Sequence, residues 1–298
     1  MIRNPFLSIV IPFHNRVELL LKTIDSIKTN DENDYEIILV DDGSEDEELT
    51  ILKDYLQENI FYFKIENCER GYARNFGAKK SRGRYLNFFD SDDISYSNHV
   101  SSFKKFVKLN SYPKIITNSY SVIDYSKKKE KKVILKGILN KKIFRHNVLS
   151  CNAIFIDKNF FLENQFSENK ELSGSEDWDL WLRLASKENI IGNKIVSSVL
   201  NNHSNRSTKK QDINKINKRL DILYTRVTNK KLISLKNNNL KLILSEIYSF
   251  KSLINSPIVS KKIESIKKFF ISIYFRPSRL FEFRTYVIIR NLLFKFIL

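Results

Sequence analysis

The sequence has few cysteines and no long apolar run. Its two cysteines, Cys68 and Cys151, are far apart and neither belongs to a Cys-x-x-Cys pair, so we expect neither a disulfide framework nor a zinc site. No stretch reaches the roughly 18 uninterrupted apolar residues that a membrane-spanning helix needs. The first apolar run ends at Pro12, which makes it too short for a secretory signal. These absences favour a reducing, cytoplasmic compartment.

Acidic residues are scarce toward the C-terminus. Residues 211–298 contain 18 Lys and Arg but only 5 Asp and Glu, a net charge of +13, whereas residues 1–210 contain 33 and 29, a net charge of +4. No Pro/Gly-rich linker separates the two regions, and we place their junction near Thr208. A basic region of this kind favours polyanionic partners, either nucleic acid or anionic lipid.

The first hundred residues alternate between strand and helix patterns. Apolar runs predict four strands, at 7–11, 36–40, 60–65 and 85–89. Helices are expected after the first three strands, the first capped by Asn15 with Glu18 as its reciprocal partner, the second polar, and the third over 72–80. This order predicts a mostly parallel sheet with helices on both faces, in which ligands lie beyond the carboxyl ends of the strands.

The rest of the chain has a mixed pattern. Short strands are expected at 114–117, 133–135 and 153–156, and a helix over 176–187. The lysine-rich stretch Lys127–Lys132 predicts a solvated hairpin tip, with contact to lipid or nucleic acid as the alternative. Residues 213–254 have the pattern of a lysine-rich amphipathic helix.

Three polar clusters follow three of the predicted strands: His14-Asn15, Asp41-Asp42 and Asp90–Asp93. Adjacent carboxylates at a strand end repel one another unless a cation neutralises them. Carboxylates with few other protein ligands suit Mg²⁺ or Mn²⁺. The alternative for Asp92 and Asp93 is an acidic cap on the following helix.

The segments Asp41–Ser44 and Arg70–Asn75 offer groups that suit a nucleotide. An aspartate at the end of a buried strand can accept hydrogen bonds from a uracil imide or from ribose hydroxyls, and the alternative is an ordinary turn closed by its side chain. Arg74 could pair with a diphosphate or with one of the acidic clusters.

Five blocks of the sequence together resemble the inverting family 2 glycosyltransferases, which have the GT-A fold. The blocks are Leu7–Pro12, Asp41–Ser44, Ala73–Gly77, Tyr85–Asp93 and Glu176-Asp177. They occur in the family's order over roughly residues 7–200. The resemblance implies a GT-A catalytic domain over residues 1–208, followed by a basic, aromatic-rich helical region over 209–298.

The resemblance also implies roles for individual residues. Donor binding falls to the residues after the first two strands, with an arginine for the diphosphate: Pro12, Asn15, Asp41, Asp42 and Arg74. Asp92 is then the metal ligand, with Asp90 nearer the ribose and His203 against the metal or diphosphate. An inverting transfer needs one base for the acceptor hydroxyl. Asp177 matches that base, with Glu176 as the alternative and a plain helix cap as another interpretation.

The implied enzyme transfers a hexose from a UDP-sugar, with Mn²⁺ or Mg²⁺, to a lipid-linked saccharide acceptor such as an undecaprenyl-diphosphate glycan. Relatives of this size act in O-antigen, capsule or lipooligosaccharide synthesis, which predicts a cytoplasmic enzyme at the inner face of the inner membrane. One alternative is a sugar nucleotidyltransferase, although Pro12–Asn15 stands where that class has a Gly- and Arg-rich loop. The other is a non-catalytic basic protein that binds membrane or nucleic acid.

The C-terminal region interleaves aromatic residues with arginines from Phe269 to Arg290. Aromatic and cationic residues without a spanning run are typical of a segment that lies at a membrane surface. A helical lid packed on the catalytic domain is one alternative, and an RNA-binding surface is another. We favour an anionic membrane surface and no nucleic acid.

Overall fold

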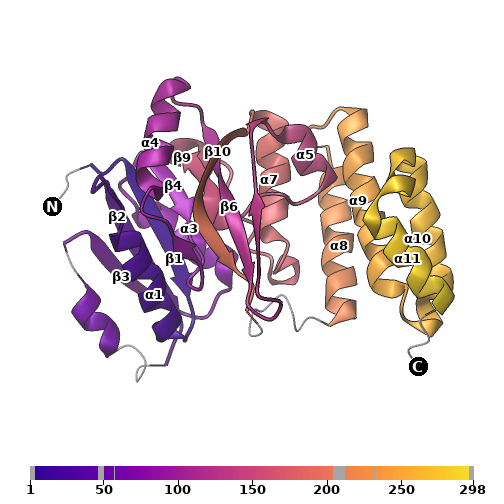
Figure 1. Cartoon of the computed structure of the whole chain (residues 1–298), viewed down its shortest axis with the longest axis horizontal. Coiled ribbons are helices and arrows are strands. Elements are labelled where there is room, and N and C mark those ends of the chain that lie inside the picture. Colours follow the sequence, from indigo (N-terminus) through magenta and orange to yellow (C-terminus); the bar gives the residue numbers. More distant parts are fainter. Residues whose placement is uncertain (1–3, 46–49, 57, 204–211, 231, 295–298) are drawn as a thin grey trace. The chain divides into compact units, whose positions relative to one another are not determined.

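The computed structural model describes residues 4–45, 50–56, 58–203, 212–230 and 232–294. The chain forms two compact units. We call Met1–Leu139 with Leu149–Lys209 the sheet unit, and Asn140–Val148 with Lys210–Leu298 the helical unit (Figure 1).

In the described residues, the sheet unit is built on one ten-stranded mixed sheet of order β3-β2-β1-β4-β9-β6-β10-β5, with β7 paired to β6 and β8 to β10. The strands are β1 (Leu7–Phe13), β2 (Tyr35–Asp42), β3 (Ile60–Ile65), β4 (Tyr85–Phe88), β5 (Ile94–Ser95), β6 (Ile115–Asp124), β7 (Lys129–Val133), β8 (Gly137–Ile138), β9 (Ile154–Asp157) and β10 (Ile191–Asn201). β3, β2, β1 and β4 are parallel neighbours. Their carboxyl ends therefore meet at one edge, as the strand–helix order predicted.

Helices cover both faces of this sheet. They are α1 (Val17–Lys28), α3 (Arg70–Lys80), α4 (His99–Leu109), α6 (Lys158–Leu162) and α7 (Glu176–Lys187), with 3₁₀ turns η1 (Ile51–Tyr55), η2 (Cys151–Ala153) and η3 (Lys170–Leu172). Alternate residues of β1 face opposite sides, so Leu7, Ile9 and Ile11 pack with α1 and α4, while Val10 faces α3. The predicted α/β sheet with helices on both faces is confirmed.

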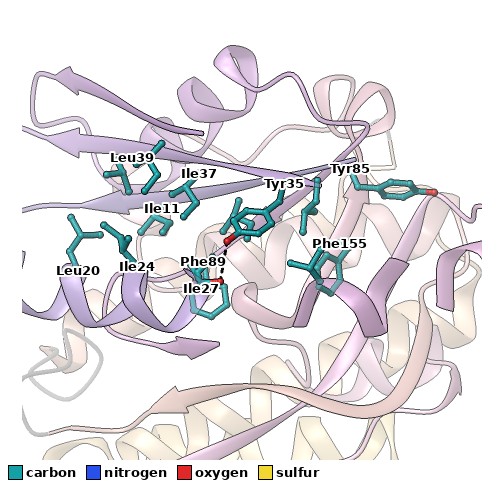
Figure 2. Close-up of a cluster of buried hydrophobic side chains, with 14 of the residues drawn as sticks. Ile11, Leu20, Ile24, Ile27, Tyr35, Ile37, Leu39, Tyr85, Phe89 and Phe155 are labelled. Carbon is teal, nitrogen blue, oxygen red and sulfur yellow. Dashed lines mark hydrogen bonds between the residues drawn. The ribbon is translucent and has the colours of Figure 1, made fainter. Parts of the chain in front are cut away.

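The core between β1, β2, α1 and α4 is shown in Figure 2. Leu20, Ile24 and Ile27 of α1 lie against Ile11 and Leu39, and all five are fully buried. The hydroxyl of Tyr35 donates to the backbone carbonyl of Ile27 at 3.2 Å, so its one polar atom is satisfied. Each such apolar side chain contributes about 1.5–3 kcal/mol on burial, which fixes β1 and β2 as the rigid base of the site.

On the other face, Gly77 allows α3 to approach the sheet closely. A Cβ at this position would lie 2.4 Å from Cγ1 of Val10 and 3.0 Å from Cγ2 of Val40. The glycine in the block Ala73–Gly77 is therefore required by helix–sheet packing. This contact sets the distance between α3 and the sheet, and therefore the position of Arg74 on that helix.

Two local predictions near β1 are wrong. The strand continues through Pro12 to Phe13. Pairing with β4 ends at Val10, so Pro12 is paired only with β2. A proline is tolerated there because it lacks the N–H that pairing on a second side would need. Asn15 does not cap α1: Asn15 and Arg16 both have positive φ, the helix begins at Val17, and the Asn15 side chain accepts from the backbone N–H of Glu45 at 3.1 Å instead.

Elsewhere the differences are smaller. In the described part of 45–59, the predicted polar helix is the short 3₁₀ turn η1. The lysine-rich hairpin exists, but Lys129–Lys132 are exposed residues of strand β7 rather than of the turn. Asp92 and Asp93 do not cap α4, since that helix begins at His99 after Asn98.

The helical unit consists of α5 (Asn140–Arg145), α8 (Ile213–Thr228), α9 (Asn237–Asn255), α10 (Lys262–Phe275) and α11 (Phe283–Phe294), with 3₁₀ turns η5 (Val259–Lys261) and η6 (Pro277–Phe281). α9 contacts all four of the other helices (Figure 1). The single helix expected over 213–254 is two, because the chain is extended at Asn229 and resumes at the asparagine-rich start of α9. α5 joins this unit although the sequence placed it in the first domain. Among the described helices, none is both long and apolar enough to cross a bilayer.

Candidate active site

A pocket of about 440 Å³ lies at the carboxyl ends of β1, β2 and β4. Its lining residues are Pro12, Phe13, His14, Asn15, Arg16, Asp42, Asn67, Glu69, Arg70, Asp90, Ser91 and Asp92. The three polar clusters predicted from the strand ends therefore meet around one pocket.

The two aspartates at the end of β2 have different positions. Asp41 is fully buried, and its carboxylate accepts from the backbone N–H of Ser44 at 2.7 Å and from the hydroxyl of Tyr62 at 2.7 Å. Asp41 thus closes the turn, which was the alternative considered for this motif, and it does not line the pocket. Asp42 does line the pocket, and the backbone N–H groups of Cys68 and Glu69 fix its carboxylate at 2.7 and 3.1 Å.

The segment after β1 forms another wall. Pro12 and Asn15 lie in the lining as predicted, and the backbone N–H of Asn15 donates to the Ser44 hydroxyl at 2.7 Å. His14, which received no predicted role, also lines the pocket, and its Nδ1 is 2.9 Å from the backbone oxygen of Asp42. These contacts tie the loops after β1 and β2 together, so the wall they form is preorganised.

Arg74 is buried behind the pocket between two carboxylates. Its guanidinium donates to Asp90 at 2.8 Å and to Glu176 at 3.1 Å. Burial opposes its charge, but the interactions with Cys151, Asp90 and Glu176 outweigh that effect and raise the pKa of Arg74. Arg74 therefore pairs with an acidic cluster, the second of its two predicted partners, and orients Asp90 toward the pocket.

The tetrapeptide Asp90–Asp93 divides into two parts. Asp93 is fully buried, and its carboxylate accepts from the side-chain amide of Asn152 at 2.8 Å and from the backbone N–H of Asn201 at 3.0 Å, which anchors it to the sheet. Asp90 and Asp92 line the pocket. Nε2 of His203 is 2.8 Å from Oδ2 of Asp92.

This arrangement fits a divalent cation. Asp90, Asp92 and Asp93 can bring one carboxylate oxygen each within 4.8 Å of one another. Because Asp93 is already bonded through both oxygens, Asp90 and Asp92 are the members of this group that line the pocket. Such carboxylates suit Mg²⁺ or Mn²⁺, which retain water and take phosphate oxygens as further ligands.

The two candidate bases at the start of α7 differ in how they are held. Glu176 is buried and accepts from Arg74 and, at 2.6 Å, from the backbone N–H of Gly174. Asp177 is partly exposed and follows it in the first turn, so neither is the helix cap, which is Ser175. Burial first, and then the charges of Asp177 and Asp93, raise the pKa of Tyr120 to about 12, so both carboxylates lie near Tyr120.

Two cations lie in the lining, Arg16 and Arg70. Arg70 opens α3 and belongs to the segment Arg70–Asn75 that the sequence predicted to suit a nucleotide. Sequence reasoning missed Arg16, which has positive φ and is exposed. Arg16 directly follows the segment Pro12–Asn15, and an arginine beside a strand-end motif is the signal that could have identified it.

Comparison with known proteins agrees with this geometry. Residues 8–163 match the family model described as "Glycosyl transferase family 2". An uncharacterized glycosyltransferase of Rickettsia conorii is 31% identical over 194 residues, which cover 62% of this chain and 31% of the relative. The GalNAc(5)-diNAcBac-PP-undecaprenol beta-1,3-glucosyltransferase of Campylobacter jejuni is 30% identical over 190 residues, or 60% of each chain. This chain thus matches less than two thirds of the length of either relative.

Two solved structures resemble nearly the whole chain. One is residues 1–349 of S. aureus TarS in complex with UDP-GlcNAc, with a TM-score of 0.71, 16% identity and coverage of 96% of this chain and 89% of TarS. The other is a mannosyltransferase of Pyrobaculum calidifontis with GDP-Man and Mn²⁺, with a TM-score of 0.60, 12% identity and coverage of 97% and 88%. At these identities the likeness concerns the fold, which is GT-A-like, as predicted.

Proposed function

Because this chain belongs to glycosyl transferase family 2, we propose that it is an inverting, metal-dependent hexosyltransferase that uses a UDP-sugar. The observation that carries the proposal is the convergence of Asp90 and Asp92, with His203 bonded to Asp92, on the pocket that Asp42, Arg16 and Arg70 also border. Carboxylates for a cation and arginines for phosphate in one pocket suit a nucleoside diphosphate.

UDP is the proposed carrier because the TarS structure holds UDP-GlcNAc in the same fold. In this chain the segment from Pro12 to Asn15 and the Asp42 carboxylate would hold the nucleoside, with Asp90 near the ribose. Asp92 and His203 would hold Mn²⁺ or Mg²⁺, which when bound neutralises the charge that develops on the departing diphosphate. Arg74 acts through Asp90, whose orientation it fixes at 2.8 Å.

Asp177 is the proposed base. Glu176 is held by Arg74 and Gly174, so accepting a proton would break a buried ion pair, whereas Asp177 is partly exposed. The acceptor oxygen forms a bond to the anomeric carbon as the bond from that carbon to the diphosphate oxygen breaks. The hydroxyl proton goes to Asp177, and UDP leaves. An α-linked donor then gives a β-linked product.

The proposed acceptor is a saccharide on a polyprenyl diphosphate, in O-antigen, capsule or lipooligosaccharide synthesis. Support comes from the Campylobacter relative, whose name specifies an undecaprenol-linked acceptor. Such an acceptor places the enzyme at the inner face of the inner membrane, and residues 211–298, with a net charge of +13, suit an anionic lipid surface.

A panel of nucleotide sugars tests the proposal. Release of UDP from UDP-hexoses should exceed release of nucleotide from GDP- and CMP-sugars, should stop with excess EDTA and should return with Mn²⁺ or Mg²⁺. Asp92→Asn should weaken binding of the UDP-sugar with metal present, and the exposed Asp54→Asn serves as a matched control. Full activity in excess EDTA would exclude the metal, and a preference for GDP-sugars would exclude the donor.

A further inference from the structure

Helices α10 and α11 carry large apolar side chains on their outside. Six aromatic residues in and between them are at least 60% exposed: Phe270, Tyr274, Phe281, Phe283, Tyr286 and Phe294. Within α10, Ile263, Phe270 and Tyr274 recur at helical spacing, and within α11 Phe283, Tyr286 and Phe294 do so. Each helix therefore has one exposed apolar face. We call the six residues the outer aromatic residues.

The buried faces of the same helices are partly polar. α10 buries Ser265 and Ser272 beside Phe269, and α11 buries Thr285 and Asn291 beside Ile288. Ser265 donates through Oγ to the backbone oxygen of Ser252 in α9 at 2.8 Å. Each helix therefore buries one large apolar residue among small or polar ones and exposes several others, a pattern that helices in contact with lipid share.

In water this arrangement is unfavourable, because contiguous exposed apolar area marks a binding surface. α10 has 14 residues and α11 has 12, so they are about 21 and 18 Å long. Both are shorter than the roughly 30 Å hydrocarbon core of a bilayer. The lengths fit helices that lie in one leaflet.

Two arginines of this region are already paired within the unit. The Arg279 guanidinium donates to Glu246 at 2.7 Å and to Glu282 at 2.8 Å, and Arg276 also pairs with Glu282. Arg276 and Arg279 are buried. These two arginines therefore do not contribute to the exposed face, and charge alone does not account for that surface.

Exposed cations do occur among the outer aromatic residues. Lys267 lies three positions before Phe270, and Arg290 lies four positions after Tyr286, so each shares the apolar face of its helix. Anionic headgroups would neutralise these cations. In a contact between two copies of the chain, the same cations would face one another and repel. Charge complementarity therefore favours lipid as the occupant of this surface.

We propose that the outer faces of α10 and α11 insert into the boundary between headgroups and acyl chains of one leaflet, held mainly by the outer aromatic residues and secondarily by charge. Partition of aromatic side chains into this layer is favourable, while Lys267 and Arg290 reach the phosphates. The inference rests on the proposed function in one respect, since a lipid-linked acceptor brings the enzyme to a bilayer.

Two matched triple variants separate apolar insertion from charge. Phe270→Ser/Phe281→Ser/Phe283→Ser removes apolar area at constant charge. Lys215→Gln/Lys230→Gln/Lys241→Gln removes three exposed charges elsewhere in the unit and keeps the aromatic residues. Binding of the full chain and both variants is measured on phosphatidylcholine vesicles and on vesicles that also contain phosphatidylglycerol, at low salt and at about 1 M salt, where the Debye length is about 3 Å.

The unaltered chain should bind neutral vesicles even at high salt. The serine variant should lose roughly 10²-fold or more of that binding, since each apolar side chain contributes about a factor of ten. The glutamine variant should keep it and lose only part of the extra affinity for anionic vesicles at low salt. Absence of binding to neutral vesicles, or equal binding by the serine variant, would overturn the proposal.

Two further measurements keep the outcomes distinct. If sedimentation without lipid shows a dimer that the serine variant dissociates, the surface is a contact between copies and the proposal is wrong. Release of UDP from the donor should be unchanged in the serine variant. If the unaltered chain releases no nucleotide from any donor but the vesicle results hold, only the proposed function fails.

Discussion

Helix α1 of the sheet unit and helix α10 of the helical unit have similar lengths, 12 and 14 residues, but opposite polarity. α1 buries Leu20, Ile24 and Ile27, whereas α10 buries Ser265 and Ser272 with Phe269 and exposes most of its other large apolar residues, Phe270 among them. Both show apolar residues at helical spacing. Periodicity alone therefore identifies an amphipathic helix without saying whether its apolar face meets protein or another apolar phase.

The two units also differ in how they use buried charge. In the sheet unit, Arg74 lies between Asp90 and Glu176 next to the pocket. In the helical unit, Glu246 of α9 is buried with Arg279, Arg284 and His146 around it, at 2.7, 2.7 and 3.2 Å. The first cluster orients a group of the candidate site, and the second links α9 to the end of α5, to η6 and to α11. Because the two clusters lie in different units, substitutions in one unit should leave the other unchanged.

The largest expected effect is confined to the sheet unit. Asp177→Asn should lower the transfer rate by about 10²–10⁴-fold, the usual contribution of a general base. Binding of UDP with metal should persist, and vesicle binding should not change. Glu176→Gln is the matched control and should reduce the rate per folded molecule less. A reversed order of severity, or an α-linked product by NMR, would assign the reaction to a different group.

The next effect belongs to the helical unit. Glu246→Gln should destabilise it by about 3–5 kcal/mol, because Arg279 and Arg284 lose their buried partner. Both tryptophans, Trp178 and Trp181, lie in the sheet unit, so selective tryptophan fluorescence reports that unit alone. The helical transition in circular dichroism should move to lower temperature while the tryptophan transition stays. A shift of both together would mean that the units unfold as one.

The same carboxylate predicts a pH dependence. Burial raises the pKa of Glu246, but the hydrogen bond from His146 and the charges of Arg284 and Arg279 lower it from 4.5 to about 2. A lowered pKa contributes stability that is complete above about pH 4.5 and is lost as the pH falls toward 2. Acid should therefore destabilise the helical unit over that window, and Glu246→Gln should remove this part of the dependence.

Much of the sheet unit was predictable because its signals are local. The apolar run of β3 and the periodicity of α7 were predicted with the observed bounds, since short buried strands and amphipathic helices depend on neighbouring residues. The location of the pocket followed from the meeting of strand ends. The sequence did not predict that Asp41 closes the turn while Asp42 lines the pocket, because these positions depend on contacts with Tyr62 and with the loop around Cys68.

Long-range pairings could not be predicted. Arg74 and Glu176 are 102 positions apart, and α5 joins the helical unit through contacts with α9 that no local pattern encodes. Asn15 is a residue type that commonly caps helices. Here its φ is positive, and its side chain accepts a hydrogen bond from Glu45 in the neighbouring loop instead. In each case tertiary contacts determined the outcome over local preference.

A smaller effect is expected at Gly77. Gly77→Ala would place a methyl group 2.4 Å from the Val10 side chain, and displacing a packed core typically costs about 1–3 kcal/mol. The tryptophan transition should move to lower temperature, and the rate should fall because Arg74 shifts with α3. Gly77→Ala combined with Val10→Ala, which makes room for the methyl group, should recover part of the rate. An unchanged transition would show that α3 adjusts freely.

The smallest effect is expected for Phe281→Ala in water, and Phe89→Ala in the sheet unit is its reference. Phe89 is fully buried in the core shown in Figure 2, so Phe89→Ala should cost about 3–5 kcal/mol. Phe281 is 93% exposed, so Phe281→Ala should change stability in water by no more than about 0.5 kcal/mol. If the outer aromatic residues meet lipid, the same substitution should lower the stability of the helical unit relative to the unaltered chain only when vesicles are present, because lipid stabilises the folded form that binds it. Thermal unfolding with and without phosphatidylcholine vesicles measures this difference. If Phe281→Ala lowered the free energy of unfolding in water by several kcal/mol, Phe281 would pack against protein. The two units would then not differ in what their large apolar side chains contact.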